Sequence, residues 1–447
     1  MNKPKSKLGK IEAIGLKRIC SDCIANGTLA RHLKAKGKKR KCSFCGEKGK
    51  TKNLRWISKK VKKVVLEQFT PTPDQPDPDG LMSLEELKST IWFRDGQSPA
   101  ELIEEIVECS SDVASDLVAY LNLKTRDFSA EREGSESPFS DEICYEDQEI
   151  NVARYHQLWD RFLFSLNHQS HFSKIRALQA LDVIFANVDS VECEEGASFV
   201  HHDKIKLFRA RRVEPSKLKQ ILSDPVKELG PPPASIVGAG RMNAVGSPIF
   251  YGATEEATAI AEIRPPVGGT VVVATFETLE PVRFLDMVAL RTAVGARDRF
   301  AKQHVESWER AYFLRQLSKL LTKPVIDAED YLASQAVAEY FSDRQDIAGI
   351  IYPSAQNPVG KNVAFFHHSS KVASLTQRLT VSENWVETGD DEGRIRYLLS
   401  EDGTLQAEIE QGDTRQLTLS LQIGTIKVLS IDSVQHSFSL TADAQCG

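Results

Sequence analysis

The spacing of apolar residues in the N-terminal half of the chain is helical. Ser98 and Pro99 are typical of an N-cap and a first helical residue, and apolar positions then follow on one face. Similar spacing predicts helices over residues 113–123 and 152–166, the second with Trp159 on its apolar side. We therefore expect a helical domain over residues 81–187, set off from the preceding residues by a proline-rich link.

From about residue 199 the pattern changes to short apolar runs bounded by glycine or proline. Runs rich in valine, isoleucine and phenylalanine predict buried strands, which are expected at 248–251, 270–276, 347–352 and 362–366. Helical patterns lie between them, at 254–264, 298–322 and 330–341. The chain is thus predicted to be α+β, with a mixed domain over residues 199–370 and a β-rich tail over 376–447.

The composition adds little to this prediction, but the charge is distributed unevenly along the chain. Hydrophobic residues make up 41% of the chain and charged residues 27%, which is typical of globular proteins. No apolar run is long enough for a membrane helix and no secretory signal is visible, so we expect a cytoplasmic protein without a membrane partner. Residues 1–63 carry a net charge of +18 and the remainder −23. A basic head of this kind is expected either to bind nucleic acid or to dock on the acidic body.

Two CxxC pairs lie in the basic head. Cys20 and Cys23 form the first pair and Cys42 and Cys45 form the second, and 18 residues separate the two pairs. Four thiolates in two such turns suit tetrahedral zinc, in a closed structural site. We therefore predict a small zinc module over residues 1–63, held together by a metal because it is too short for a core of its own.

The mixed domain contains no phosphate loop of a known pattern, and its polar residues form an arginine-led series instead. After Phe208-Arg209-Ala210-Arg211 come Arg241, Tyr251 and a short helix that should begin at Thr254 as N-cap. Pro265 should end that helix and leave Glu262 in its last turn. A carboxylate there opposes the helix dipole, which predicts a cationic partner for Glu262.

These motifs, taken in order, resemble the RES domain. The series continues with Tyr331 to Tyr340, with Gly349 to Asn357 and with Asn362 to Phe366. The resemblance implies a fold similar to ADP-ribosyltransferase toxins and activity on NAD, in toxins of bacterial toxin–antitoxin pairs whose partner is an Xre-type DNA-binding antitoxin. The CxxC pairs and the helical region look like the N-terminal domain that precedes RES in longer members and is classed with HEPN domains.

The resemblance also implies site residues. The family's Arg, Glu and Ser match Arg241, Glu262 and Ser354, which would be catalytic. Arg209 and Arg241 would hold phosphates, Tyr251 would pack on the nicotinamide or its ribose, and Asn357 is a further candidate for binding NAD. Ala210 departs from members with tyrosine there, and the arginine alignment could shift to Arg211.

Elementary chemistry agrees with these roles. Cleavage of the nicotinamide–ribose bond needs cations for the pyrophosphate and a carboxylate near the positive charge that develops on the ribose. It does not need a general acid, because the leaving group departs neutral. The resemblance thus implies an NAD glycohydrolase or phosphorylase, and the residue types are consistent with it.

Other functions stay open from the sequence. The same site could transfer ADP-ribose to a protein, because the acceptor is not encoded in a motif. Arg161 and His168 match the spacing of HEPN ribonucleases, which leaves a nucleic-acid-targeting protein as a second class. A catalytically inactive interaction module is the third. The oligomeric state and the role of residues 376–447 are not indicated by any pattern.

Overall fold

The chain folds into two units, and one of them takes in a segment from much later in the sequence. The computed structural model describes residues 7–75, 94–126, 137–167, 171–323, 331–375, 377–387, 393–404, 413 and 415–434. The first unit comprises Met1–Asn151 and Gly295–Glu309, and the second comprises Val152–Val294 and Arg310–Gly447. The helices expected between residues 152 and 187 thus belong to the second unit. Among the described residues, no helix is both long and apolar enough to cross a bilayer.

The first unit combines a small antiparallel sheet with packed helices. Its three-stranded sheet has the order β1-β3-β2. The elements are α1 (Lys7–Leu16), β1 (Arg18–Cys20), α2 (Gly27–Lys36), β2 (Lys38–Lys41), β3 (Lys48–Asn53), α3 (Leu54–Gln68), β4 (Phe69–Pro71), α5 (Pro99–Val107), α6 (Ser111–Thr125) and β5 (Tyr145–Asp147). The predicted N-cap of α5 is confirmed, since Ser98 Oγ accepts from the Glu101 backbone N–H and Glu101 accepts from the Ser98 N–H in return.

The segment Gly295–Glu309 joins this unit through Asp298. The Asp298 carboxylate accepts hydrogen bonds from Asn26 Nδ2 at 3.1 Å and from the Thr28 backbone N–H at 3.0 Å. Phe300 packs against the apolar core of the unit. The helix expected over 298–322 therefore begins only at His304, because the residues before it bond to α2 and not to their own helix.

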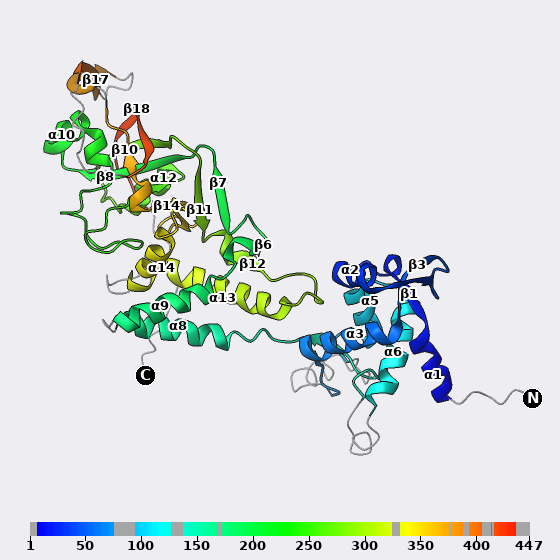
Figure 1. The fold of residues 1–447 in the computed structure, drawn as a ribbon. Helices are drawn as coiled ribbons and strands as arrows, with labels where there is room; N and C mark the ends of the chain where they lie inside the picture. The colour runs from blue at the N-terminus through cyan, green and yellow to red at the C-terminus, as the bar shows by residue number, and fades with distance from the viewer. Residues whose placement is uncertain are drawn as a thin grey trace, which may run out of the picture. The chain divides into compact units, whose positions relative to one another are not determined.

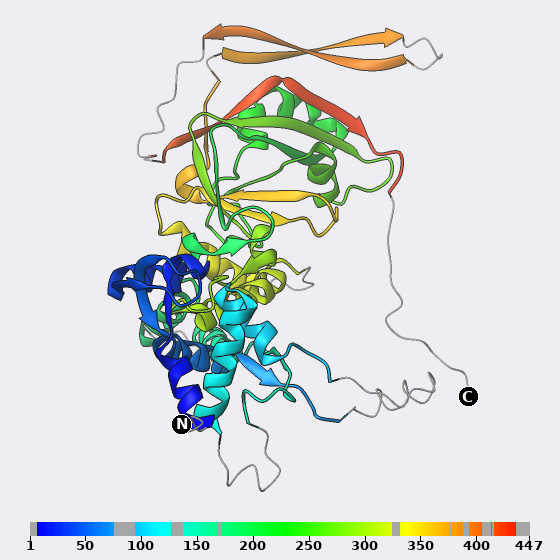
Figure 2. The ribbon, with the colours of Figure 1, turned by 90° about the vertical axis from the view of Figure 1, so that its right-hand side faces the viewer.

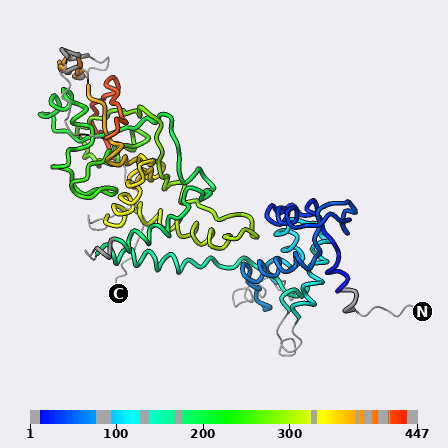
Figure 3. Tube along the Cα trace, viewed as in Figure 1, coloured from blue at the N-terminus to red at the C-terminus, as the bar shows by residue number. Residues whose placement is uncertain are grey.

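The second unit is built on a nine-stranded sheet with the order β15-β18-β10-β8-β9-β14-β13-β11-β7. These strands are β7 (Phe199–His202), β8 (Lys206–Val213), β9 (Phe250–Ala253), β10 (Thr270–Thr278), β11 (Val282–Asp286), β13 (Gly349–Pro353), β14 (Lys361–Phe365), β15 (Lys371–Val372) and β18 (Leu417–Ser430). The four predicted strands are confirmed as β9, β10, β13 and β14, with bounds shifted by up to two residues. The tail adds β18 to the sheet beside β10 (Figure 3, where β18 is red).

Both faces of this sheet are buried. Successive residues of β13 enter different cores: Ile350 packs on one side and Ile351 on the other. One core contains the helices α8 (Ala153–Leu166), α9 (His171–Ile184), α13 (His304–Thr322) and α14 (Leu332–Ser342), which gather on one side in Figure 1. The other core takes apolar residues from α10 (Leu218–Ser223) and α11 (Pro225–Leu229). The mixed α+β class predicted from the sequence is therefore correct.

Two further strands of the tail form a separate ribbon. β16 (Gln377–Glu387) and β17 (Gly393–Thr404) pair only with each other among the described strands. The ribbon is long and twisted in Figure 2. Val381, Tyr397 and Leu399 are half-buried against the core that also holds α10, so one face of the ribbon helps to cover that core.

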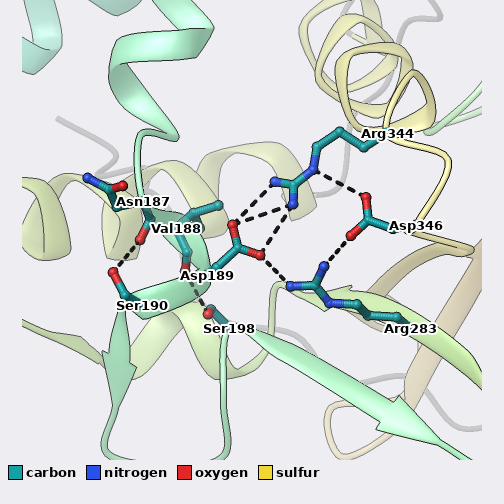
Figure 4. A network of polar contacts seen from close by, with 8 residues as sticks. All are labelled: Asn187, Val188, Asp189, Ser190, Ser198, Arg283, Arg344 and Asp346. Carbon is teal, nitrogen blue, oxygen red and sulfur yellow. Dashed lines mark hydrogen bonds and ion pairs between the residues drawn. The ribbon is translucent and has the colours of Figure 1, made fainter.

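A polar network fastens the helical layer to the edge of the sheet. Asp189, which follows α9, accepts hydrogen bonds from both Arg283 of β11 and Arg344 after α14 (Figure 4). Both arginines also pair with Asp346. The two guanidinium groups lie over the ring of Phe199, at 4.2 and 5.4 Å from its centroid. Each charge thus has an opposite partner, as a half-buried ion pair requires.

Candidate active site

A cavity opens where two central strands of the sheet separate. β8 and β9 are neighbours in the sheet, but they share only the pair Phe208 and Ala253. A cavity of about 530 Å³ lies there. Its lining comes from residues far apart in sequence: Phe208, Arg209, Ala210, Arg241, Tyr251, Gly252, Ala253, Ala259, Glu262, Ile263, Arg264, Tyr331, Tyr352, Ala355, Gln356 and Asn362. This volume is within the range of about 300–1,000 Å³ usual for small-molecule sites.

The short helix α12 (Glu256–Glu262) carries Glu262 to the cavity. The prediction that Thr254 caps this helix is wrong, because its N-cap is Glu255. Thr254 instead donates from its backbone N–H to the Lys361 carbonyl at 3.0 Å and so continues the pairing of β9 with β14. Glu262 is the last residue of the helix and is exposed to solvent at the cavity.

One oxygen of Glu262 is held by two neutral donors. Ser354 Oγ donates to Glu262 Oε1 at 2.5 Å, and Asn362 Nδ2 donates to the same oxygen at 2.7 Å. Among the described residues, Glu262 Oε2 has no recorded partner and Glu262 forms no ion pair. The prediction of a cationic partner is therefore wrong for the described residues. A hydroxyl and an amide stabilise this carboxylate at the helix end instead.

Ser354 has no hydrogen-bonding capacity left over. Its buried hydroxyl accepts from the backbone N–H groups of Gln356, at 3.1 Å, and Asn357, at 3.0 Å, and it donates to Glu262. A hydroxyl offers one donor and two acceptor positions, so all three are filled. In this arrangement Ser354 orients the carboxylate and is not free to act as a nucleophile.

Two of the predicted arginines line the cavity and are anchored at its wall. Arg209 donates to the Tyr251 carbonyl at 2.9 Å, between the two separated strands, and lies over the Phe250 ring. Burial, with Arg211 nearby, lowers the pKa of Arg209 to about 10, so the group remains a cation at neutral pH. Arg241 donates through one nitrogen to the Leu321 and Lys323 carbonyls at the end of α13, where the helix dipole is negative.

Tyr251 presents its ring to the cavity and anchors its hydroxyl behind it. The hydroxyl donates to Asn243 Oδ1 at 2.8 Å and accepts from the Met242 backbone N–H at 3.0 Å. Burial raises the pKa of the Tyr251 phenol, which therefore stays neutral. Gly240 is required here, since a Cβ would lie 2.5 Å from Asn243 Oδ1 and 2.8 Å from the Tyr251 hydroxyl. The loop before β9 thus fixes the aromatic wall.

The structure separates some candidates from the cavity. Arg211 pairs with Glu228 at 2.6 Å and is not a lining residue, so the alternative arginine alignment has no support from the geometry. Asn357 does not line the cavity either, and its amide donates to Thr258 Oγ1 at 2.8 Å. Arg161 is exposed on α8, whereas His168 lies outside the described residues.

Several lining residues were not singled out from the sequence as site residues. Asn362 is the second residue of β14, and nothing in its local pattern indicates that its amide reaches Glu262. Tyr352 is a buried phenol whose pKa is raised by burial and by Tyr251 and Glu262 nearby. Arg264 has a left-handed backbone, with φ 45°, just before Pro265. A residue before proline usually adopts an extended backbone, so no signal for this conformation was present in the sequence.

The four predicted metal ligands converge in the first unit. The sulfur atoms of Cys20, Cys23, Cys42 and Cys45 all lie within 4.8 Å of one another. Cys20 Sγ is 3.6 Å from both Cys23 Sγ and Cys45 Sγ, and Cys23 Sγ is 3.8 Å from Cys42 Sγ. A tetrahedral ion with metal–sulfur bonds of 2.3 Å separates its sulfur ligands by about 3.8 Å. The four thiols thus fit a tetrahedral metal ion.

Comparisons with known proteins match the second unit. Residues 206–385, less than half of the chain, match the family model of the RES domain. A solved structure of the M. tuberculosis MbcT–MbcA toxin–antitoxin complex aligns at 12% identity over 44% of this chain and 85% of that chain, with a TM-score of 0.19. A likeness of that size carries no argument about the fold. No curated protein matches this chain. The matched residues include β8, β9, α12, β13 and β14, which surround the cavity, so this part of the second unit is similar to the RES domain.

Proposed function

We propose that this chain cleaves the nicotinamide–ribose bond of NAD, as a glycohydrolase or a phosphorylase, and is the toxin of a bacterial toxin–antitoxin pair. The RES domain match supports the class of activity. The observation that carries the proposal is the carboxylate of Glu262. It is held on one oxygen by Ser354 and Asn362 in a cavity that three arginines line.

The charges of the cavity suit a dinucleotide. The charged lining residues are three arginines, Arg209, Arg241 and Arg264, and one carboxylate, Glu262. The lining therefore carries a net positive charge. A pyrophosphate carries two negative charges, and guanidinium groups bind phosphate oxygens with paired hydrogen bonds. Arg241 uses one nitrogen for its anchor, which leaves other donors for a phosphate. We expect the pyrophosphate to bind beside Arg209 and Arg241.

The same arrangement suits the bond-breaking step. As nicotinamide leaves, positive charge develops on the ribose carbon and ring oxygen, and a fixed carboxylate nearby stabilises it. Because Glu262 Oε1 already accepts two hydrogen bonds, Oε2 is the oxygen available to face the ribose. Ser354 is then a positioning residue, and the neutral ring of Tyr251 offers a flat surface to the nicotinamide or its ribose.

The test is nicotinamide release from NAD by the purified full chain, with and without phosphate. We expect Glu262→Gln to lower turnover by about 100-fold or more, the cost typical of losing one electrostatic stabiliser. Glu256→Gln is the matched control, because Glu256 lies on the same helix but pairs with Lys427 outside the cavity. Arg211→Ala is the corresponding control for Arg209→Ala.

The outcomes separate the alternatives. Release that requires phosphate identifies a phosphorylase, and release without it identifies a glycohydrolase. Labelling of a protein from NAD that carries a tag on its adenine would identify an ADP-ribosyltransferase instead. A folded wild-type protein that is inactive in all three assays and is not stabilised by NAD would refute the proposal.

An antitoxin partner belongs to the same proposal. We expect expression of the wild-type chain to stop bacterial growth, and Glu262→Gln to relieve the arrest. Co-expression of an Xre-type DNA-binding protein encoded beside it should also restore growth. Restored growth with a stable complex of the two proteins would support the pairing, and arrest that persists with Glu262→Gln would contradict the link between toxicity and this site.

We infer that the four-cysteine cluster holds a structural zinc ion. Zinc would cross-link β1 to the loop between β2 and β3 and stabilise a sheet of three short strands. Metal analysis should give one zinc per chain, and Cys42→Ser should lose it and lower the melting temperature of the first unit. Cys109→Ser is the control, because Cys109 lies outside the cluster. Full stability of the metal-free protein would contradict the inference.

A further inference from the structure

The first unit carries a dense run of positive charge whose arrangement is unusual for a β-sheet. Residues 27–66 contain 15 lysines and arginines and a single acid, Glu47. In the antiparallel pair of β2 and β3, Lys39 lies directly opposite Lys50 and Lys41 lies directly opposite Lys48. Like charges in directly opposite positions repel each other and destabilise a sheet. These four lysines occupy one face of the ribbon, because paired residues point to the same side.

Nothing in the described residues offsets this repulsion. All four lysines are exposed, and no ion pair is recorded for any of them within the described ranges. Thr51, on the opposite face of β3, is buried, so the lysine side faces solvent. The fold therefore bears a repulsion that a bound anion would remove.

The charge continues from the strands onto α3 through an aromatic ring. Lys52 is the next residue of β3 on the same face. Its ammonium lies 5.9 Å from the Trp56 ring centroid, and Lys60 lies 5.2 Å from the same ring. Burial, and then Lys36 and Lys63 nearby, lower the pKa of Lys60. We call Lys39, Lys41, Lys48, Lys50, Lys52, Trp56 and Lys60 the lysine face.

We propose that the lysine face binds the phosphodiester backbone of a nucleic acid. Same-face residues of a strand repeat about every 7 Å, and one nucleic-acid strand in a duplex rises 3.4 Å per phosphate. Successive lysines of β3 are therefore far enough apart for each to contact a different phosphate. A half-buried tryptophan among lysines also suits nucleotides, whose bases stack on aromatic rings, better than it suits an acidic protein. The proposal does not depend on the NAD site.

Binding of the full chain to fluorescein-labelled 30-nucleotide RNA and 30-base-pair DNA, followed by anisotropy at several salt concentrations, tests the proposal. Each phosphate contact contributes about −0.7 to the salt slope for single strands and about −0.9 for duplex DNA. Six cations therefore predict a slope near −4 for RNA, which weakens binding roughly 300-fold between 50 and 200 mM salt. The two probes show which form of nucleic acid is preferred.

The decisive variant changes Lys39, Lys41, Lys48 and Lys50 to glutamine. Its salt slope for RNA should be smaller by about 3, since four phosphate contacts are lost. It should melt no lower than wild type, because cross-strand repulsion is removed. The matched control changes four exposed lysines of the second unit, Lys204, Lys206, Lys217 and Lys227, to glutamine and should bind like wild type. If the variant with all four substitutions does not fold, the double variant Lys39→Gln, Lys50→Gln should reduce the salt slope for RNA by about half as much as expected for all four.

Three results would overturn the proposal. The first is a wild-type protein that binds neither probe at 50 mM salt, as expected if the basic region docks on the acidic part of the chain. The second is unchanged binding by a folded lysine-face variant. The third is polyglutamate that competes as well as RNA at equal charge, which would assign the face to acidic proteins.

Discussion

Replacement of Ser354 by alanine tests how Glu262 is held. The side chain is buried, so alanine removes one hydroxyl with little change of shape. Three hydrogen bonds are lost, but only the 2.5 Å bond to Glu262 Oε1 acts on the proposed catalytic carboxylate. The loop itself keeps its backbone bond from the Ser354 N–H to the Gly360 carbonyl.

The expected effect follows from the strength of that bond. A hydrogen bond to a charged group contributes about 1.5–3 kcal/mol, and each 1.36 kcal/mol in a barrier is a factor of ten in rate. Asn362 still holds the same oxygen, so we expect the lower half of that range, a loss of about 13- to 45-fold in kcat. The KM for NAD should change little, because Ser354 does not line the cavity.

The assay is nicotinamide release by Ser354→Ala, Glu262→Gln and the double variant, with thermal melting to verify folding. If Ser354 acts through Glu262, the second substitution adds little to the first, because the two residues form one unit. A Ser354→Ala protein with kcat within threefold of wild type would refute the positioning role. Fully multiplicative losses in the double variant would show that Ser354 acts on the reaction by another route.

Two other substitutions probe the second unit. Gly240→Ala should cost about 1–3 kcal/mol of stability, because its Cβ would lie 2.5 Å from Asn243 Oδ1. Gly238→Ala is the control and should melt like wild type, because there is open space around Gly238. Equal melting temperatures of the two variants would contradict the packing argument. Burial would raise the pKa of Asp189, but the hydrogen bonds from Arg283 and Arg344 outweigh it and lower that pKa. A depressed pKa stabilises the fold above the unfolded value of about 3.9 and loses that effect as the pH falls through the folded value. Asp189→Asn should therefore be less stable than wild type at pH 7, by at most about 1 kcal/mol for this half-exposed group. The gap in urea midpoints should narrow as the pH falls below about 3.9 and through the lower folded pKa. A gap that does not narrow with falling pH would exclude this origin.

Local pattern was sufficient for β9, α12, β13 and β14, which line much of the cavity, but not for β8. Runs such as Thr270 to Phe276 are buried on both faces, so their apolar character is continuous and easily recognised. β8 was not predicted as a strand, because its arginines interrupt the apolar pattern that marks the other strands. The predicted roles of Arg209, Arg241, Tyr251, Glu262 and Ser354 stay predictions, although the structure brings all five to one region.

What the sequence could not supply were contacts between distant residues. Glu262 and Asn362 are 100 positions apart, and only the pairing of β9 with β14 brings the amide to the carboxylate. A cationic partner for Glu262 was expected from the helix dipole alone, but two neutral donors, Ser354 and Asn362, stabilise its carboxylate instead. The start of α13 was misplaced for a similar reason, since the preceding residues bond to a helix some 270 positions earlier.

That long-range bond has a consequence for how the protein can be divided. Asp298 accepts from the backbone N–H in the first turn of α2, so the start of one helix is completed by a carboxylate encoded much later. A fragment that stops at Asn151 would begin α2 with that N–H unsatisfied and would lack the Phe300 side chain in its core. The two units are thus interleaved in the gene, and recombination that exchanged one of them for a foreign domain would have to carry two separate stretches of coding sequence.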